Sequence, residues 1–146
     1  IIFPYSNPTS HSECTAEQAY TWSKGKAIFA SGSPFAPVNY EGKIYTPGQG
    51  NNVFIFPALG MAIFATEAKR VTDDMLLTAA EAVAEQVTEA NFENGLIYPH
   101  VNDILKVSMN VAVRIAEHIF DTGLAGISRP ENIRAFVKSK MYLPKY

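Results

Sequence analysis

The sequence predicts an α/β fold, in which a few buried parallel strands are followed by mostly helical segments. Apolar runs at residues 1–5 and 27–30 both stop at polar turn residues and have the length of buried strands. Between them, Thr15 and Gln18 form the capping-box pattern of a helix start, and a strand–helix–strand order is typical of parallel pairing. After Gly50, apolar residues recur at helical spacing.

The first strand and the first helix have recognisable limits. Pro4 cannot donate to a strand ladder, which restricts strand 1–5 to a position where one donor can be spared. The helix after Thr15 should run to about Lys24, because Gly25 supplies the residue type that follows many helix ends.

The rest of the chain predicts a hairpin and several helices. Residues 38–45 fit a hairpin that turns at residues 41–42. The next helix should begin at Asn51 or Asn52, and the run 53–65 is apolar all round, which predicts that its aromatic side chains are buried. Later helices are expected at 73–87 after the cap Thr72, from Asn102 or Asp103 to just before Gly123, and after the capping-box pattern at Ser128 and Glu131. The apolar stripe of the helix before Gly123 consists of Ile104, Val107, Val111, Ile115 and Ile119.

Size and composition indicate one globular but incomplete domain. The 146 residues fit one domain of ordinary size, and 47% hydrophobic with 18% charged residues is typical of a globular chain. Two buried parallel strands do not make a self-sufficient sheet. The chain also starts within a predicted buried strand. Both observations predict a piece of a longer protein whose remaining strands lie upstream.

Charge and cysteine content exclude several classes of function. A net charge of −2 gives no electrostatic support for nucleic-acid binding or for binding to an anionic membrane. The longest apolar run, 53–65, is too short to span a bilayer. Cys14 is the only cysteine, so an internal disulfide is excluded and a reducing compartment is favoured.

Polar residues gather where the predicted strands end. In open α/β sheets, ligands bind beyond the carboxyl ends of the strands, here residues 6–8 and 31–33. A helix that begins at Asn51 or Asn52 would direct free N–H groups and partial positive charge to the same crevice. Carboxamides offer a donor and an acceptor, so they can hold a carboxylate or an amide. A simple helix cap is the plainer interpretation of one asparagine, and it leaves the second unexplained.

Other motifs give no catalytic or metal site. Gly48 and Gly50 lack the third glycine of a dinucleotide fingerprint, because Val53 occupies that position, so we interpret both glycines as turn residues. The nucleophile-elbow pattern G-x-S-x-G is missing. His11 and Cys14 are three residues apart, and no other ligand types cluster near them in the sequence.

Several ordered motifs resemble the malic enzyme family along the whole chain. The matching segments are 2–10 (IFPYSNPTS), 13–20 (ECTAEQAY), 29–35 (FASGSPF), 47–52 (PGQGNN), 95–99 (GLIYP) and 141–142 (MY). The resemblance implies the C-terminal portion of a Rossmann-like doubly wound parallel sheet domain, followed by mostly helical segments. Residues 1–146 would then be a partial nucleotide-binding domain, with a βαβ unit and hairpin at 1–50 and a helical C-terminal part at 51–146.

The family resemblance also implies an activity. Malic enzymes oxidise malate with NAD or NADP and a divalent metal, Mg or Mn, and release pyruvate and carbon dioxide. The family's catalytic tyrosine and lysine, its metal-binding carboxylates and its glycine-rich cofactor loop would lie upstream of this chain. We therefore expect the 146-residue segment alone to be inactive, with the remainder of the enzyme as its partner in a homo-oligomer.

The residues that carry over are polar side chains at the strand ends. By resemblance, Asn7, Asn51 and Asn52 would bind the substrate, malate or pyruvate. Ser6, Asn7 and Asn52 would contact the nicotinamide cofactor. No catalytic or metal-binding residue is expected within this segment. The two adjacent asparagines would then orient the carboxylates of malate against the reactive ring.

Two alternatives stay open on the sequence alone. One is a self-standing, non-enzymatic interaction or assembly module, because an open sheet edge can pair with another chain. The other is a half-domain of a different NAD(P)-dependent dehydrogenase. The preference between NAD and NADP, the oligomeric state and the compartment, whether cytoplasm, mitochondrion or plastid, also stay open.

Overall fold

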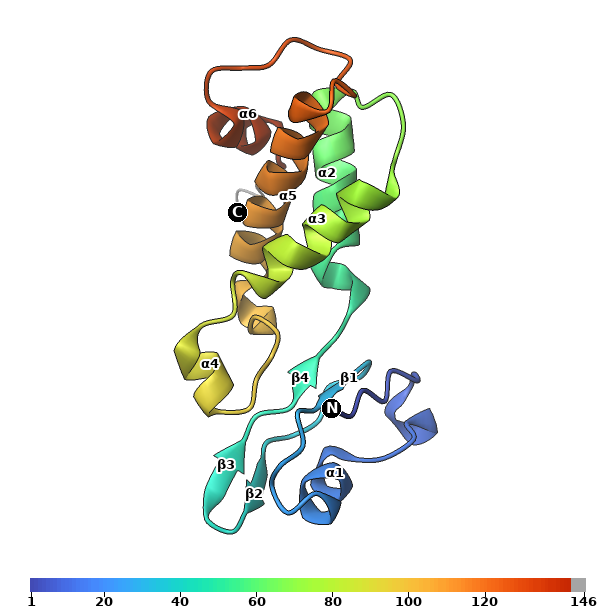
Figure 1. Ribbon diagram of the computed structural model, residues 1–146, viewed down its shortest axis with the longest axis vertical. Helices are drawn as coiled ribbons and strands as arrows, with labels where there is room; N and C mark the ends of the chain where they lie inside the picture. Colours follow the sequence, from blue (N-terminus) through green and yellow to red (C-terminus); the bar gives the residue numbers. More distant parts are fainter. Residues whose placement is uncertain (143–146) are drawn as a thin grey trace. The chain divides into compact units, whose positions relative to one another are not determined.

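The computed structural model describes residues 1–142, and within them the chain forms two compact units. The first consists of Ile1–Asn52 and Ala84–Asp103, and the second of Val53–Val83 and the segment from Ile104 onward. Figure 1 shows short strands in the first unit and a group of helices in the second. Each unit has its own buried side chains, so each is described by itself.

Three extended segments of the first unit run parallel to one another. Ile2 pairs with Phe29 in an isolated parallel bridge. The strand β1 (Ala30–Ser31) pairs in parallel with β4 (Gly48–Gln49). The sequence predicts β4 only as a turn, because a Gly-Gln pair carries no apolar signal. The predicted parallel arrangement is confirmed, but with shorter elements than the apolar runs suggest.

Backbone hydrogen bonds extend this parallel pairing past the strands. Gly32 N–H donates to Pro4 O at 3.3 Å, and Gly50 N–H donates to Ser31 O at 2.9 Å. The segment that contains β1 therefore lies between the N-terminal segment and β4. Because all three segments are parallel, their carboxyl ends meet at one edge of the sheet.

The helix α1 (Ala16–Trp22) begins as its sequence predicts. Thr15 accepts a hydrogen bond from the backbone N–H of Gln18, whose side chain accepts one from Thr15 N–H. The helix ends before Lys24, which has a φ of 53°, and Gly25 follows with a φ of 72°. Both residues are in the left-handed region, which terminates a helix.

The first unit has a small aromatic core under α1. Tyr20 and Phe29 are completely buried, with their ring centroids 5.9 Å apart. The hairpin is confirmed as β2 (Val38–Tyr40) paired antiparallel with β3 (Lys43–Tyr45). Tyr45 stacks on Tyr20, with ring centroids 4.5 Å apart. The hairpin is thus part of this core.

Short helical pieces complete the first unit. They are the 3₁₀ turn η1 (Thr9–His11), the helix α4 (Glu89–Glu93) and the 3₁₀ turn η3 (Val101–Asp103). α4 has no counterpart among the helices that the sequence predicts, although Thr88 and Asn91 form a capping box at its start. Five residues are too short for a helical periodicity to be recognised.

The second unit is built of helices (Figure 1). They are α2 (Phe56–Thr66), α3 (Asp73–Ala84), α5 (Ile104–Asp121) and α6 (Ile133–Lys140). α5 packs against both α2 and α6. Four of the five residues of the predicted α5 stripe, Val107, Val111, Ile115 and Ile119, are buried, and Ile104 at the first turn is half-buried. Within residues 1–142, no helix has the length and apolar character needed to cross a bilayer.

The start of α2 differs from the prediction. The helix begins at Phe56, after the 3₁₀ turn η2 (Asn52–Phe54), so neither Asn51 nor Asn52 caps it. The physical reason is Pro57, which stands in the first turn of α2. Proline lacks an N–H, and it would break the hydrogen-bond ladder of a helix that had begun five or six residues earlier.

The prediction that this helix is buried on every side is also wrong. Phe54 is buried, as predicted, but Phe56 and Phe64 are 56% and 65% exposed in the described chain. The small residues of α2, including Ala58 and Ala62, form the face that packs in the second unit. An apolar sequence therefore shows only that a helix can be buried, and the packing partners decide which face is.

Two predicted helix caps are wrong. α6 is capped by Asn132, whose Oδ1 accepts the backbone N–H of Ala135 at 2.8 Å, and it begins after the predicted box at Ser128. The Thr72 hydroxyl before α3 is buried and has no hydrogen-bond partner among residues 1–142. The error at α6 has a local cause: Ser128 and Asn132 both precede that helix, and the sequence pattern does not rank them. α3 does begin directly after Thr72 as predicted, but the buried hydroxyl does not make the capping bond.

The cap of α6 can be tested directly. Asn132→Ala should lower the free energy of unfolding by about 1 kcal/mol, because Ala135 N–H loses its side-chain acceptor. The matched variant Ser128→Ala should change it by less than about 0.5 kcal/mol. Urea unfolding followed by circular dichroism measures both. A larger loss of unfolding free energy for Ser128→Ala than for Asn132→Ala would show that Ser128, as predicted, is the cap.

Candidate functional site

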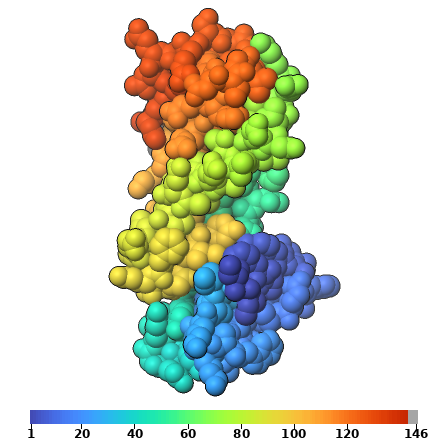
Figure 2. All heavy atoms as spheres, in the orientation of Figure 1, coloured from blue at the N-terminus to red at the C-terminus, as the bar shows by residue number. Residues whose placement is uncertain are grey.

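Polar residues lie beyond the carboxyl end of each parallel segment of the first unit. Asn7 follows the N-terminal segment, Ser33 follows β1, and Asn51 and Asn52 follow β4. Because β1 lies between the other two segments, these residues come to one edge of the sheet. We call this group the carboxamide edge. In Figure 2 the N-terminal residues, in dark blue, lie at the molecular surface.

Asn7 contacts the turn that follows β1. Its Oδ1 accepts a hydrogen bond from Ser33 Oγ at 2.5 Å. A Cβ atom added to Gly32 would lie 2.9 Å from Asn7 Nδ2 and 2.5 Å from Tyr5 O. The absence of a side chain at position 32 therefore allows the Asn7 carboxamide to lie against the turn.

The turn itself is held from several directions. Ser31 is buried, and its Oγ donates to Ser33 O at 2.8 Å. Gln49 Nε2, from β4, donates to Gly32 O at 3.3 Å. Side chains from two neighbouring strands thus fix the backbone that presents Ser33 to Asn7.

Ser6 makes a different contact. Its hydroxyl donates to Glu13 Oε1 at 2.6 Å. This hydrogen bond stabilises the carboxylate and lowers the pKa of Glu13 below its usual value. Ser6 Oγ keeps its acceptor capacity, so a ligand that approaches it would have to donate a hydrogen bond.

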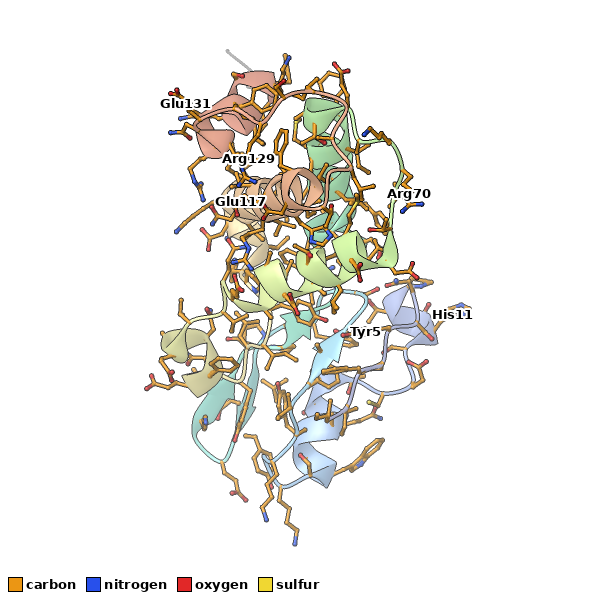
Figure 3. All side chains as sticks on the ribbon, turned by 45° about the horizontal axis from the view of Figure 1, so that its top comes forward. Tyr5, His11, Arg70, Glu117, Arg129 and Glu131 are labelled. Atoms are coloured by element: carbon orange, nitrogen blue, oxygen red, sulfur yellow. The ribbon has the colours of Figure 1, made fainter. Side chains whose placement is uncertain are left out.

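The loop that leads to Asn51 is covered by a tyrosine. A Cβ atom added to Gly50 would lie 2.7 Å from Tyr5 Cε1 and 2.8 Å from Tyr5 Oη. Tyr5 Oη is hydrogen-bonded to Tyr98 Oη at 2.9 Å. Desolvation, with a smaller contribution from Tyr98, raises the pKa of Tyr5, so its hydroxyl stays protonated at neutral pH. Tyr5 is labelled in Figure 3.

Sequence reasoning does not find the contact between Tyr5 and Tyr98. The two residues are 93 positions apart, and each is part of an apolar run that indicates only a buried segment. The one residue in the sequence that could have indicated a close contact here is Gly50, whose small size allows the close approach of the Tyr5 ring. That glycine is interpreted above as a turn residue, because the dinucleotide fingerprint is incomplete.

Asn51 and Asn52 are exposed and lie just after the bond from Gly50 N–H to Ser31 O. Asn52 opens the 3₁₀ turn η2, and α2 begins only at Phe56. The register of the sheet, and not a helix cap, therefore brings the two asparagines to the edge that carries Asn7.

Two further features lie outside the carboxamide edge. Residues 1–142 contain no group of three or more His, Cys, Asp or Glu side chains that could hold a metal ion. A surface concavity of about 400 Å³ is lined by Thr15, Glu17, Phe35, Ala36, Pro37, Val38 and Asn39. None of the predicted site residues lines it. The carboxamide edge itself consists of amide and hydroxyl side chains, whose chemistry is neutral hydrogen bonding.

The contact of Gly50 with Tyr5 gives a prediction about stability. Gly50→Ala should lower the free energy of unfolding by about 1–3 kcal/mol, because the new methyl group overlaps the Tyr5 ring. In a Tyr5→Leu background the loss should be smaller, since leucine lacks the overlapping atoms. Gly60→Ala is the control: it has open space and should stabilise α2 by up to about 1 kcal/mol.

Chemical denaturation of the four members of the Tyr5/Gly50 cycle measures this coupling. An equal loss in both backgrounds would show that the Tyr5 ring is not what requires glycine at position 50.

Comparison with known proteins places the chain in one family. The family model described as "Malic enzyme, NAD binding domain" matches residues 1–120. The chain is 56% identical to the chloroplastic NADP-dependent malic enzyme of Flaveria pringlei and 54% identical to the NADP-dependent malic enzyme of Phaseolus vulgaris. The alignments cover 100% of the chain but only 23% and 25% of these two proteins. The chain thus spans about a quarter of the length of these relatives.

Solved structures agree with this assignment. The chain superimposes on the malic enzyme of Pyrococcus horikoshii with a TM-score of 0.71 and 27% identity, over 96% of this chain and 28% of that one. The malic enzyme of Entamoeba histolytica gives 0.72 at 20% identity, over 96% and 26%, which shows the fold alone. The predicted fold, part of a Rossmann-like α/β domain, is confirmed. On the strength of these matches, which together cover the whole chain, this protein belongs to the malic enzyme family, and its residues 1–120 match the family's NAD binding domain.

Proposed function

We propose that the chain is the C-terminal portion of a malic enzyme that oxidatively decarboxylates malate to pyruvate and carbon dioxide. Family membership supports the reaction. The observation that carries the role of this segment is the carboxamide edge, where the sheet register gathers asparagines from two parallel segments. Ligands of open α/β sheets bind at such an edge.

The proposed role of the asparagines is to orient the substrate. The carboxamides of Asn7, Asn51 and Asn52 have N–H donors for the carboxylates of malate, and they carry no charge that changes with pH. A hydrogen bond to a charged group contributes roughly 1.5–3 kcal/mol. Two carboxylates held at fixed positions restrict the rotation of the diacid. That restriction supports the close alignment that hydride transfer needs.

The same edge suits the nicotinamide end of the cofactor. Ser6, Asn7 and Asn52 present neutral donors and acceptors, which match the neutral carboxamide of nicotinamide. When bound, NADP or NAD would accept the hydride from malate. The names of the relatives from Flaveria pringlei and Phaseolus vulgaris favour NADP.

The rest of the machinery would belong to other parts of the enzyme. By the pattern of the family, Mg or Mn would be held by carboxylates upstream of this chain. The 146-residue chain should therefore be inactive alone and active within a full-length homo-oligomer. The chloroplastic relative from Flaveria pringlei supports a plastid among the possible compartments.

Removal of one carboxamide tests the proposal. In the full-length enzyme that contains this chain, Asn51→Ala should lower kcat/KM for malate by roughly ten- to a hundred-fold. Asn39→Ala is the matched control, because it removes the same side chain from the β2–β3 hairpin, where it accepts Gly42 N–H. Steady-state kinetics with varied malate measure both variants.

An unchanged kcat/KM for Asn51→Ala would remove this residue from the substrate site. An equal loss for Asn39→Ala would show that the effect is a general loss of folded enzyme. Malate oxidation by the isolated 146-residue chain would contradict the division of the catalytic set between this segment and the rest of the protein.

A further inference from the structure

The contact between Ser33 and Asn7 joins two strand ends of the carboxamide edge. The hydroxyl of Ser33 donates to Asn7 Oδ1 at 2.5 Å, across 26 positions of sequence. A carboxamide is nearly symmetric in shape, but one end is an acceptor and the other carries two donors. A neighbour that is hydrogen-bonded to one end therefore restricts the rotation of the amide and fixes where the other end lies.

Ser33 is well placed to restrict the rotation of the Asn7 amide, because its own position is fixed. Ser31 Oγ donates to Ser33 O, and Gln49 Nε2 donates to Gly32 O. The backbone N–H of Gly32 donates to Pro4 O in the segment that leads to Asn7. The turn and Asn7 are thus attached to the same sheet, and relative motion between them is restricted.

Gly32 limits the remaining freedom of the carboxamide. A Cβ atom at this position would be 2.9 Å from Asn7 Nδ2 and 3.0 Å from Oδ1, so the amide lies directly against the glycine. Its location is therefore set by packing. Rotation about its terminal bond would still turn the plane of the amide, and the hydrogen bond with Ser33 restricts that rotation.

We propose that Ser33 is a positioning residue that fixes the plane of the Asn7 carboxamide for its contact with the ligand. This inference rests on the proposed function, in which Asn7 meets a malate carboxylate and the nicotinamide carboxamide. Without the Ser33 hydroxyl, the amide can rotate about its terminal bond. It then meets the ligand in the productive geometry only part of the time, which weakens the alignment that hydride transfer needs.

The test is a double-mutant cycle in the full-length enzyme that contains this chain. Ser33→Ala should lower kcat/KM for malate roughly three- to tenfold, the range expected for loss of one neutral hydrogen bond. In an Asn7→Ala background the same substitution should have no further effect, because the group it orients is gone. Ser33→Thr keeps the hydroxyl and should restore most of the activity.

Control measurements separate positioning from folding. Ser139→Ala removes a hydroxyl that donates to Phe136 O in α6 and should leave kcat/KM unchanged. Thermal unfolding of each variant reports on stability, and a structural role for Ser33 would lower activity equally in the presence and absence of the Asn7 side chain.

Each outcome has a definite meaning. Non-additive losses with rescue by threonine support the proposal. A Ser33→Ala enzyme with normal kcat/KM, or additive losses in the cycle, would overturn it while the role of Asn7 survives. An Asn7→Ala enzyme with normal kcat/KM would instead overturn the proposed substrate contact of Asn7, and the positioning role with it.

Discussion

Parallel pairing of three short extended segments is the constraint on which the carboxamide edge depends. The segment at β1 is central, because it accepts and donates backbone hydrogen bonds on both sides, to the N-terminal residues and to β4. Parallel strands place their carboxyl ends together, so residues that follow different segments become neighbours. The turn at Gly32 and Ser33 then joins two of these ends through side chains as well as backbone.

Local sequence signals predicted those features that local interactions determine. The capping box at Thr15, the hairpin turn at residues 41–42 and the apolar stripe of α5 each depend on residues a few positions apart, and all three are confirmed. The strand β4 and the start of α2 were not predicted correctly. β4 forms because it pairs with β1, since its own composition does not favour a strand. Pro57 moves the start of α2 to Phe56.

The candidate site also has one part that the sequence predicts and one part that it does not. The asparagines were identified because they follow predicted strands, and their grouping at one edge follows from topology. The contacts that shape this edge were not predictable, because Ser33 meets Asn7 across 26 positions and Tyr98 meets Tyr5 across 93. Family membership excludes a different dehydrogenase half-domain, and alignment of the whole chain with enzymes gives the assembly module no support. The substrate and cofactor roles of the individual residues stay predictions.

The return of residues 84–103 to the first unit has a consequence for folding during synthesis. Tyr98, which bonds to Tyr5, is translated long after the N-terminal segment, β1 and β4. Contacts so distant in sequence close a long loop, which slows folding. The early segments therefore lack their contact with Tyr98 until residues 84–103 have been synthesised. A ribosome stalled before this return would hold a nascent chain whose first sheet is already translated but lacks the tyrosine that braces it.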